Sequence, residues 1–171
     1  MQKKRISPQD LALMALLLAL QIVLSRFCSI QVPGVKIGFA FIPTVMAARR
    51  YGIFGAATVA GLADFLGALL FPSGAYHPGF TVSAIIGGAF WGWLVYRKVT
   101  LPRVLAAALA NKVVVTLLLN TLWLSQILDK GYLLLLPDRV FQAVVMTIFE
   151  TLLTMLLLRH PTIDKLLKQK F

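Results

Sequence analysis

Four ionisable residues lie inside long apolar stretches of the sequence, where charged groups are least expected. They are Arg26, Asp64, Lys112 and Glu150. A charged side chain at the depth of the lipid hydrocarbon is costly, so such residues pair with one another or mark a binding site. Two kinds of chemistry are therefore predicted, namely internal ion pairing and the binding of an anion by cationic side chains.

Lys112 and Glu150 are predicted to form a structural ion pair. At a rise of about 1.5 Å per residue, Lys112 lies roughly 14 Å from the start of a helix expected at 103, and Glu150 lies roughly 16–18 Å from the start of one expected at 138. Both figures place the side chains near the middle of a bilayer, whose hydrocarbon core is about 30 Å thick. The alternative is that the long Lys112 side chain snorkels, so that its ammonium group reaches the cytoplasmic headgroups.

Arg26 and Asp64 fall at similar depth near the outer surface, and they form either a structural ion pair or part of a binding site. Other cationic, aromatic and amide residues fall at the same ends: Lys36, Phe39, Tyr76, His77, Phe80, Asn120, Trp123 and Arg139. Guanidinium groups bind carboxylates through paired hydrogen bonds, and aromatic faces stack on planar rings. The set predicts a ligand that is anionic at one end and flat and aromatic at the other, with an interfacial aromatic belt as the alternative.

The elements that must position these residues are predicted to be six membrane-spanning helices in one domain, residues 1–171. The apolar stretches fall near 8–28, 36–49, 51–71, 79–97, 103–128 and 138–160, and about 20 apolar residues cross a bilayer. The fold class is thus an all-α membrane protein. The second helix is short and contains Pro43, which indicates either an interruption that lines a binding site or an ordinary proline kink.

Lysine and arginine alternate between the two sets of helix junctions. One set holds Lys3, Lys4, Arg5, Arg49, Arg50, Arg97, Lys98, Arg103, Arg159, Lys165, Lys168 and Lys170, and Lys112, inside the fifth expected helix, is counted with that side. The other set holds only Arg26, Lys36, Lys130 and Arg139. Cytoplasmic junctions carry the excess of cations, so an even number of spans and two cytoplasmic termini are predicted. Because the cations flank apolar runs, the net charge of +11 is attributed to topology and anionic lipid, and no nucleic-acid partner is expected.

Small residues recur at four-residue spacing, which allows close approach of helix backbones. In the third and fourth helices, Ala56, Ala60, Gly88 and Gly92 predict packing inside the bundle. In the first helix, Ala15 and Ala19 stand in a leucine-rich stretch. They predict either internal packing or a smooth outer face on which another membrane protein docks.

The sequence contains no set of residues that indicates catalysis. The phosphate-binding pattern G-x-x-x-x-G-K-[ST] is absent, so ATP hydrolysis by that mechanism is excluded. Two histidines and the single Cys28 do not supply a metal site. We therefore expect neither catalytic residues nor a metal or other cofactor, and a transport subunit that takes its energy from partners fits better than an enzyme.

The chain resembles the substrate-binding S components of energy-coupling factor (ECF) vitamin transporters, and within them the folate-specific members. The blocks that carry the resemblance are LSRFCSI at 24–30, KIGFAFIP at 36–43, ADFLGALLFPSGAYHPGFT at 63–81, NTLWLS at 120–125 and the turn expected at Leu136 to Arg139. They run from the first helix to the sixth. The resemblance implies a six-helix fold in a bacterial-type cell membrane that binds folate or a reduced folate near the outer face. It also implies partners, namely a transmembrane coupling subunit and two ATPases.

The resemblance also assigns roles to residues at matching positions. Arg26 would contact the ligand, followed by Lys36 and Phe39. Asp64 would either hydrogen-bond the pterin edge or hold Arg26 in place, and the second role is favoured. Tyr76 and His77 would cover the pocket, with Phe80 beneath them. Asn120 and Trp123 would line the fifth helix, Arg139 would attract the glutamate tail, and Ala15 with Ala19 would contact the coupling subunit. His77 stands where a second aromatic residue is expected, which bears on the cover of the pocket, and Ile53 stands where proline is expected, which bears only on a turn. Because specificity depends on a few pocket residues, an S component for a different vitamin, such as riboflavin or thiamine, is the alternative.

Overall fold

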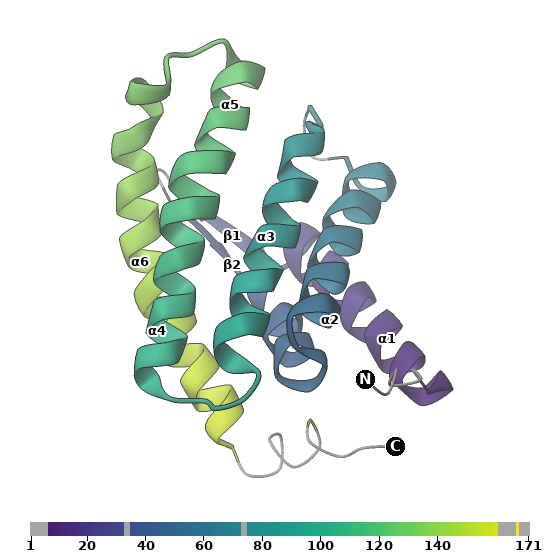
Figure 1. Ribbon diagram of the computed structural model, residues 1–171. Helices are drawn as coiled ribbons and strands as arrows, with labels where there is room; N and C mark the ends of the chain where they lie inside the picture. The colour runs from purple at the N-terminus through teal and green to yellow at the C-terminus, as the bar shows by residue number, and fades with distance from the viewer. Residues whose placement is uncertain (1–6, 33–34, 73–74, 161–166, 168–171) are drawn as a thin grey trace.

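The structure is a computed structural model, and it describes residues 7–32, 35–72, 75–160 and 167. Helices dominate these residues, and a pair of short strands lies among them (Figure 1). The elements are α1 (Pro8–Arg26), β1 (Ser29–Val32), β2 (Val35–Gly38), α2 (Phe41–Leu70), α3 (Pro78–Val95), α4 (Leu101–Ala110), η1 (Asn111–Asn120), α5 (Thr121–Leu128) and α6 (Tyr132–Arg159). The cations predicted to mark the cytoplasmic side at positions 3–5, 165, 168 and 170 lie outside the described residues.

Five helical stretches in the described part of the chain are long and apolar enough to cross a membrane. They are Pro8–Arg26, Phe41–Leu70, Pro78–Val95, Leu101–Leu128 and Tyr132–Arg159. Most of each stretch is not buried inside the protein, as expected of helices that face lipid. The all-helical class predicted from the sequence is therefore confirmed.

The longest stretch, α2, is interrupted at Gly52. The backbone there has φ 71° and ψ −151°, a region that essentially only glycine adopts. The sequence predicted that one helix ends at 49 and the next begins at 51, so the interruption falls within a residue or two of the expected boundary. It divides α2 into a short first part, residues 41–51, and a longer second part, residues 53–70.

Buried side chains fix the position of this interruption. Arg50 donates through Nη2 to Asp10 Oδ1 of α1 over 2.9 Å, and its side chain is only 4% exposed. Arg49 donates through Nη1 to the carbonyl oxygen of Tyr96, just after α3. The two arginines therefore join α2 to the start of α1 and the end of α3, in addition to any effect on topology.

The prediction of a helix from residue 36 is wrong for its first residues. Val35–Gly38 is a strand that pairs antiparallel with Ser29–Val32, in a register that sets Ile30 opposite Ile37. Because α2 begins at Phe41, Pro43 lies in its first turn, where proline removes no helical hydrogen bond and causes no kink. Neither alternative predicted for Pro43, an interruption or a kink, is therefore found there, and the non-helical backbone of this segment is the strand pair before α2.

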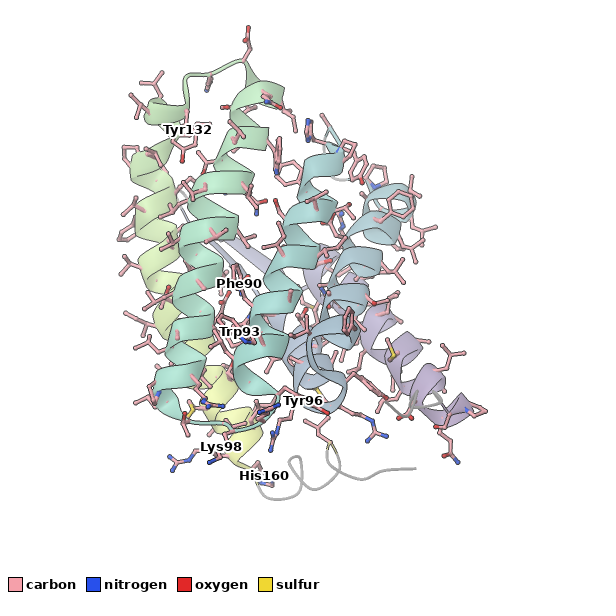
Figure 2. The ribbon with its side chains drawn as sticks, viewed as in Figure 1. Phe90, Trp93, Tyr96, Lys98, Tyr132 and His160 are labelled. Carbon is pink, nitrogen blue, oxygen red and sulfur yellow. The ribbon has the colours of Figure 1, made fainter. Side chains whose placement is uncertain are left out.

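The sixth helix begins earlier than expected. It starts at Tyr132 rather than 138, and Pro137 lies within it, so the turn predicted from Leu136 to Arg139 is wrong. Tyr132 lies at the upper end of α6 in Figure 2, and its hydroxyl donates to the carbonyl oxygen of Leu117 over 2.8 Å. This contact with η1 helps to hold the early turns of α6 despite the proline.

The predicted helix 103–128 is one continuous stretch, but its middle third is a π-helix, η1. The wider turns leave carbonyl groups that side chains satisfy, since Thr121 donates through Oγ1 to the carbonyl of Thr116, five residues back. Asn111 donates to the carbonyl of Gly87 on α3 over 3.2 Å. Sequence periodicity cannot separate such a segment from an α-helix, because both repeat in fewer than five residues.

The predicted close packing of small residues is confirmed for α2 and α3. A Cβ atom added to Gly88 would lie 2.5 Å from the carbonyl oxygen of Ala56, and one added to Gly92 would lie 2.5 Å from the Cα atom of Ile53. The backbones of the two helices are therefore in direct contact. Ala56 and Ala60 are buried in the same interface.

The connections between the helices lie at two opposite ends of the bundle. In Figure 1 the start of α1, the end of α6 and the α3–α4 connection lie at the lower end, and the α2–α3 and α5–α6 connections lie at the upper end. Tyr96 and Lys98 mark the lower end in Figure 2. Gly52 belongs there too, because a Cβ atom added to it would lie 3.4 Å from the Tyr96 ring. We use the terms lower end and upper end in this sense below.

Candidate ligand-binding site at the upper end of the bundle

An aromatic stack joins α5 to the start of α3. The His77 ring lies parallel to the Trp123 indole, with centroids 5.0 Å apart and 19° between the planes. His77 caps α3, because its Nδ1 atom accepts a hydrogen bond from the Gly79 N–H over 3.0 Å. Trp123 donates through Nε1 to Ser83 Oγ over 3.0 Å. Both rings are thus fixed by polar contacts as well as by stacking.

Glycine is required at position 79 for this stack. A Cβ atom added there would lie 2.4 Å from two indole carbons of Trp123, far inside van der Waals contact. Phe80 adds an edge-on contact with His77, at 6.5 Å between centroids. The segment from His77 to Phe80 therefore stacks the His77 ring on the Trp123 indole, sets Gly79 against the same indole and places the Phe80 ring beside His77.

A chain of hydroxyl groups joins Tyr76 to Asp64. Thr81 donates through Oγ1 to Asp64 Oδ2 over 2.8 Å, and the Tyr76 hydroxyl lies 2.8 Å from the same Oγ1. A threonine hydroxyl has one proton, which is used on the carboxylate. Tyr76 must therefore donate to Thr81, and the direction of the whole chain is set by Asp64.

Arg26 ends α1 and lies against α2 at the same level. A Cβ atom added to Gly67 would lie 3.2 Å from Arg26 Nε, so the glycine makes room for the guanidinium group. Gly67 follows Asp64 by three positions, and residues at that spacing are neighbours on a helix surface. The structure therefore places the Arg26 side chain, which comes from α1, against the part of α2 that carries Asp64.

Phe39 lies with aromatic residues of α6 rather than with the His77–Trp123 stack. Its ring meets Phe149 edge-on at 5.5 Å between centroids, and Phe149 also meets Phe41 at 6.2 Å. These contacts join the end of β2 to α6. Lys36 belongs to β2 opposite Gln31, and its side chain lies outside the described part of the structure.

Asn120 is the last residue of η1, one helical turn before Trp123. Its Oδ1 atom is buried and accepts no hydrogen bond from the residues that the structure describes. A buried acceptor without a donor costs free energy. Asn120 thus offers a hydrogen-bond acceptor on the same side of the helix as the stacked indole.

Arg139 lies near the upper end of α6 and is partly buried. It makes no ion pair or hydrogen bond with a described residue. The structure does not bring it into contact with Arg26 or with the aromatic stack. A role for Arg139 toward the ligand therefore stays a prediction.

Lys112 and Glu150 are brought together as the sequence predicts. Lys112 Nζ lies 2.6 Å from Glu150 Oε1, with side chains 13% and 6% exposed.

Ala15 and Ala19 are exposed on α1 beside Leu16, which is 63% exposed. Internal packing of the two alanines, the alternative left open by the sequence, is therefore wrong within the chain itself.

Three residues of this region were missed by sequence reasoning: Thr81, Ser83 and Phe149. Thr81 and Ser83 are small polar residues of α3 whose importance depends on partners from other helices. Phe149 precedes the predicted ion-pair residue Glu150, and an aromatic residue inside an apolar helix carries no signal of its own. Among the residues that the structure describes, no three His, Cys, Asp or Glu side chains lie together in a way that could hold a metal ion.

Comparison with known proteins defines the class of this protein. The family model described as "ECF transporter, substrate-specific component" matches residues 9–160. The chain is 41% identical over 134 residues to the folate transporter FolT of Clostridium novyi (strain NT), with 78% of each chain covered. It is 25% identical over 174 residues to the folate transporter FolT of Leuconostoc mesenteroides subsp. mesenteroides, with 98% of this chain and 94% of the relative covered.

A solved structure shares the fold. It is described as the crystal structure of FolT bound with folic acid, and it matches with a TM-score of 0.78 and 33% identity over 86% of this chain and 89% of that one. The apolar helices and these relatives define a helical membrane protein of the transporter class. More particularly, the chain belongs to the family of substrate-specific components of ECF transporters, which are non-catalytic transport subunits.

Proposed function

We propose that this chain captures folate at the outer face of the cell membrane for uptake by an ATP-driven partner module. The observation that carries the proposal is that the Tyr76–Thr81–Asp64 hydrogen-bond chain joins the residue before His77, which stacks on Trp123, to the part of α2 on which Arg26 lies. A pterin ring is flat and rich in N–H donors, and glutamate carboxylates are anionic. Stacked rings and a guanidinium group are the matching partners.

The two named relatives and the folic-acid-bound structure support folate as the ligand. Asn120 supplies an acceptor for a ring N–H, and Tyr76 with Phe80 borders the stack from α3 and the segment before it. Lys36, Phe39 and Arg139 are proposed to complete the site by contacts with the rest of the vitamin. The Lys112–Glu150 pair is proposed to lock α6 to η1 rather than to bind ligand.

We further propose six membrane crossings with both termini in the cytoplasm. The interruption at Gly52 supports two crossings within α2. The first part of α2 has only 11 residues and spans about 16 Å at 1.5 Å per residue, so β1 and β2 would complete that crossing. Non-helical backbone is tolerated at membrane depth where protein covers it, and β2 contacts α6 while β1 contacts α1.

The partner module is proposed to consist of a transmembrane coupling subunit and two ATPases. The exposed Ala15 and Ala19, with Leu16 and Leu20 beside them, are the proposed contact with the coupling subunit. Small residues on an exposed helix face allow another helix to approach closely. This chain would then recognise the vitamin, and the partner module would supply the energy for its uptake.

The proposal is tested by titrating the purified chain with folate in the absence of ATP. We expect tight binding by the unchanged protein and a loss of about tenfold to a hundredfold in affinity for Arg26→Ala, because a hydrogen bond to a charged group contributes about 1.5–3 kcal/mol. Arg103→Ala is the matched control, since Arg103 is exposed at the opposite end, on α4. Thermal unfolding of both variants separates lost binding from lost folding.

Two outcomes would reject the proposal. Binding of riboflavin or thiamine in place of folate would reject the ligand and retain the family. Equal folate affinity of Arg26→Ala and Arg103→Ala would reject the site.

A further inference from the structure

A buried polar stripe runs along the lower half of α6. Thr147, Glu150, Thr151 and Thr154 are 7%, 5%, 6% and 1% exposed. Their spacing of three, four and seven positions places them on one face of the helix. The neighbouring elements α4 and η1 pack on α6, and Lys112 of η1 reaches this face to bond Glu150.

The three threonines of the stripe differ in how their hydroxyls are satisfied. Thr147 donates through Oγ1 to the Ala143 carbonyl, four residues back, over 2.7 Å, which is the usual arrangement in an apolar helix. Thr151 and Thr154 do not follow it. Their Oγ1 atoms are buried and have no hydrogen-bond partner among the residues that the structure describes. Two hydroxyls on residues three positions apart thus make no hydrogen bond to the carbonyls of their own helix.

We infer that a water molecule bridges the hydroxyls of Thr151 and Thr154 beside the Lys112–Glu150 pair. Side chains three positions apart have Cβ atoms about 5–6 Å apart. One water with two hydrogen bonds of about 2.8 Å joins oxygens roughly 4.5 Å apart, so a single molecule fits this spacing. Buried water is held by about three polar partners.

The ion pair supplies the third partner. Glu150 accepts one hydrogen bond from Lys112, whereas a carboxylate has about four acceptor sites. Lys112 also retains two of its three N–H donors. Glu150 and Thr154 are four positions apart and are therefore neighbours on the helix surface. The inferred water thus takes Glu150 as an acceptor or Lys112 as a donor, and it reduces the cost of keeping the two charges inside the bundle. This site is separate from the proposed vitamin site and does not depend on it.

Isosteric replacement tests the inference. Thr151→Val, Thr154→Val and the double variant keep the branched shape and replace only the hydroxyl by a methyl group. We expect each single variant to lower the midpoint of thermal unfolding by about 2–4 °C. The double variant should lose no more than either single variant, because the one shared water is lost at the first substitution.

Two results would overturn the inference. If the hydroxyls were dry, valine would leave the midpoint unchanged or raise it. If each hydroxyl had its own partner, the two losses would add. Thr147→Val is the control for loss of a hydroxyl that bonds its own helix, and Thr151→Ser retains the hydroxyl and should restore most of the loss. Should a variant fail to fold, water density within hydrogen-bonding distance of both threonines in an experimental structure of the unchanged protein decides the question.

Discussion

The Lys112–Glu150 pair shows how a single substitution acts when a partner charge is buried. Lys112→Met leaves the Glu150 carboxylate without its cation in a site where the acid is 6% exposed. We expect the free energy of unfolding to fall by about 3–5 kcal/mol. The measurement is denaturant unfolding in detergent micelles. Lys98→Met removes an exposed lysine and should change the value by less than about 0.5 kcal/mol.

The double variant Lys112→Met with Glu150→Leu should regain most of that loss, because both charges are removed and apolar groups fill their place. If the double variant were as unstable as the sum of the single ones, the pair would not act as a unit. Its role as a lock between η1 and α6 would then be rejected.

The Tyr76–Thr81–Asp64 chain gives a second prediction at the level of single residues. Thr81→Val removes the hydroxyl that joins Tyr76 to Asp64, and Tyr76→Phe removes the donor at its end. Each should weaken folate binding about fivefold, which corresponds to one hydrogen bond of about 1 kcal/mol. The double variant should be no weaker, and Thr81→Ser should bind as the unchanged protein does. Losses that add in the double variant would show that the two hydroxyls act separately.

The chemistry of the larger side chains could be predicted from the sequence, but the small polar contacts could not. Tyr76, His77 and Trp123 were identified because rings and cations at the same membrane depth must either meet or face lipid. Thr81 and Ser83 gave no such signal, since a hydroxyl is ordinary on a helix until its partner is known. Arg139 shows the converse, because its charge drew attention and it forms no ion pair or hydrogen bond with another described residue.

At the scale of elements, Gly52 is the residue on which the shape of α2 depends. Its φ of 71° and ψ of −151° exclude side chains, including asparagine, which adopts positive φ only in the left-handed helical region. Gly52→Ala and Gly52→Asn should each lower the free energy of unfolding by about 1–3 kcal/mol. Gly131→Ala is the control, because Gly131 has a φ of −57° and an added Cβ meets nothing closer than 3.8 Å. Equal stability of the Gly52 and Gly131 variants would contradict this account of the interruption.

Long apolar elements were predicted well and irregular ones poorly. The ends of α1, α3 and the α4–α5 stretch fall close to the expected boundaries, since apolar length and flanking proline mark them directly. Residues 29–38 were not expected to pair as strands, because four-residue strands give too short a pattern. The turn expected from Leu136 to Arg139 is part of α6 instead, because the helix continues through Pro137 and the contact of Tyr132 with η1 holds its start.

At the scale of the whole molecule, the number of crossings determines which ends share a side of the membrane. With six crossings, positions 9 and 98 lie in the cytoplasm and position 130 lies outside. With five, positions 9 and 130 share one side and position 98 lies on the other. The distinction is open to labelling, because Gln9, Lys98 and Lys130 are exposed.

Single cysteines at these positions, in a Cys28→Ser background that removes the only native thiol, provide the test. A membrane-impermeant maleimide applied to intact cells should label Lys130→Cys. It should label Gln9→Cys and Lys98→Cys only after permeabilisation. Opposite behaviour of Gln9→Cys and Lys98→Cys would reject the six-crossing topology.

The proposal that the upper end binds folate is tested most directly by identifying the ligand that co-purifies with the protein. The chain is purified from folate-supplied cells, and its ligand is released and identified by mass spectrometry. We predict about one folate per chain for the unchanged protein and for Arg103→Ala, and little or none for Arg26→Ala. Recovery of a different vitamin, or of no ligand even after folate is added to the purified chain, would contradict the proposed function.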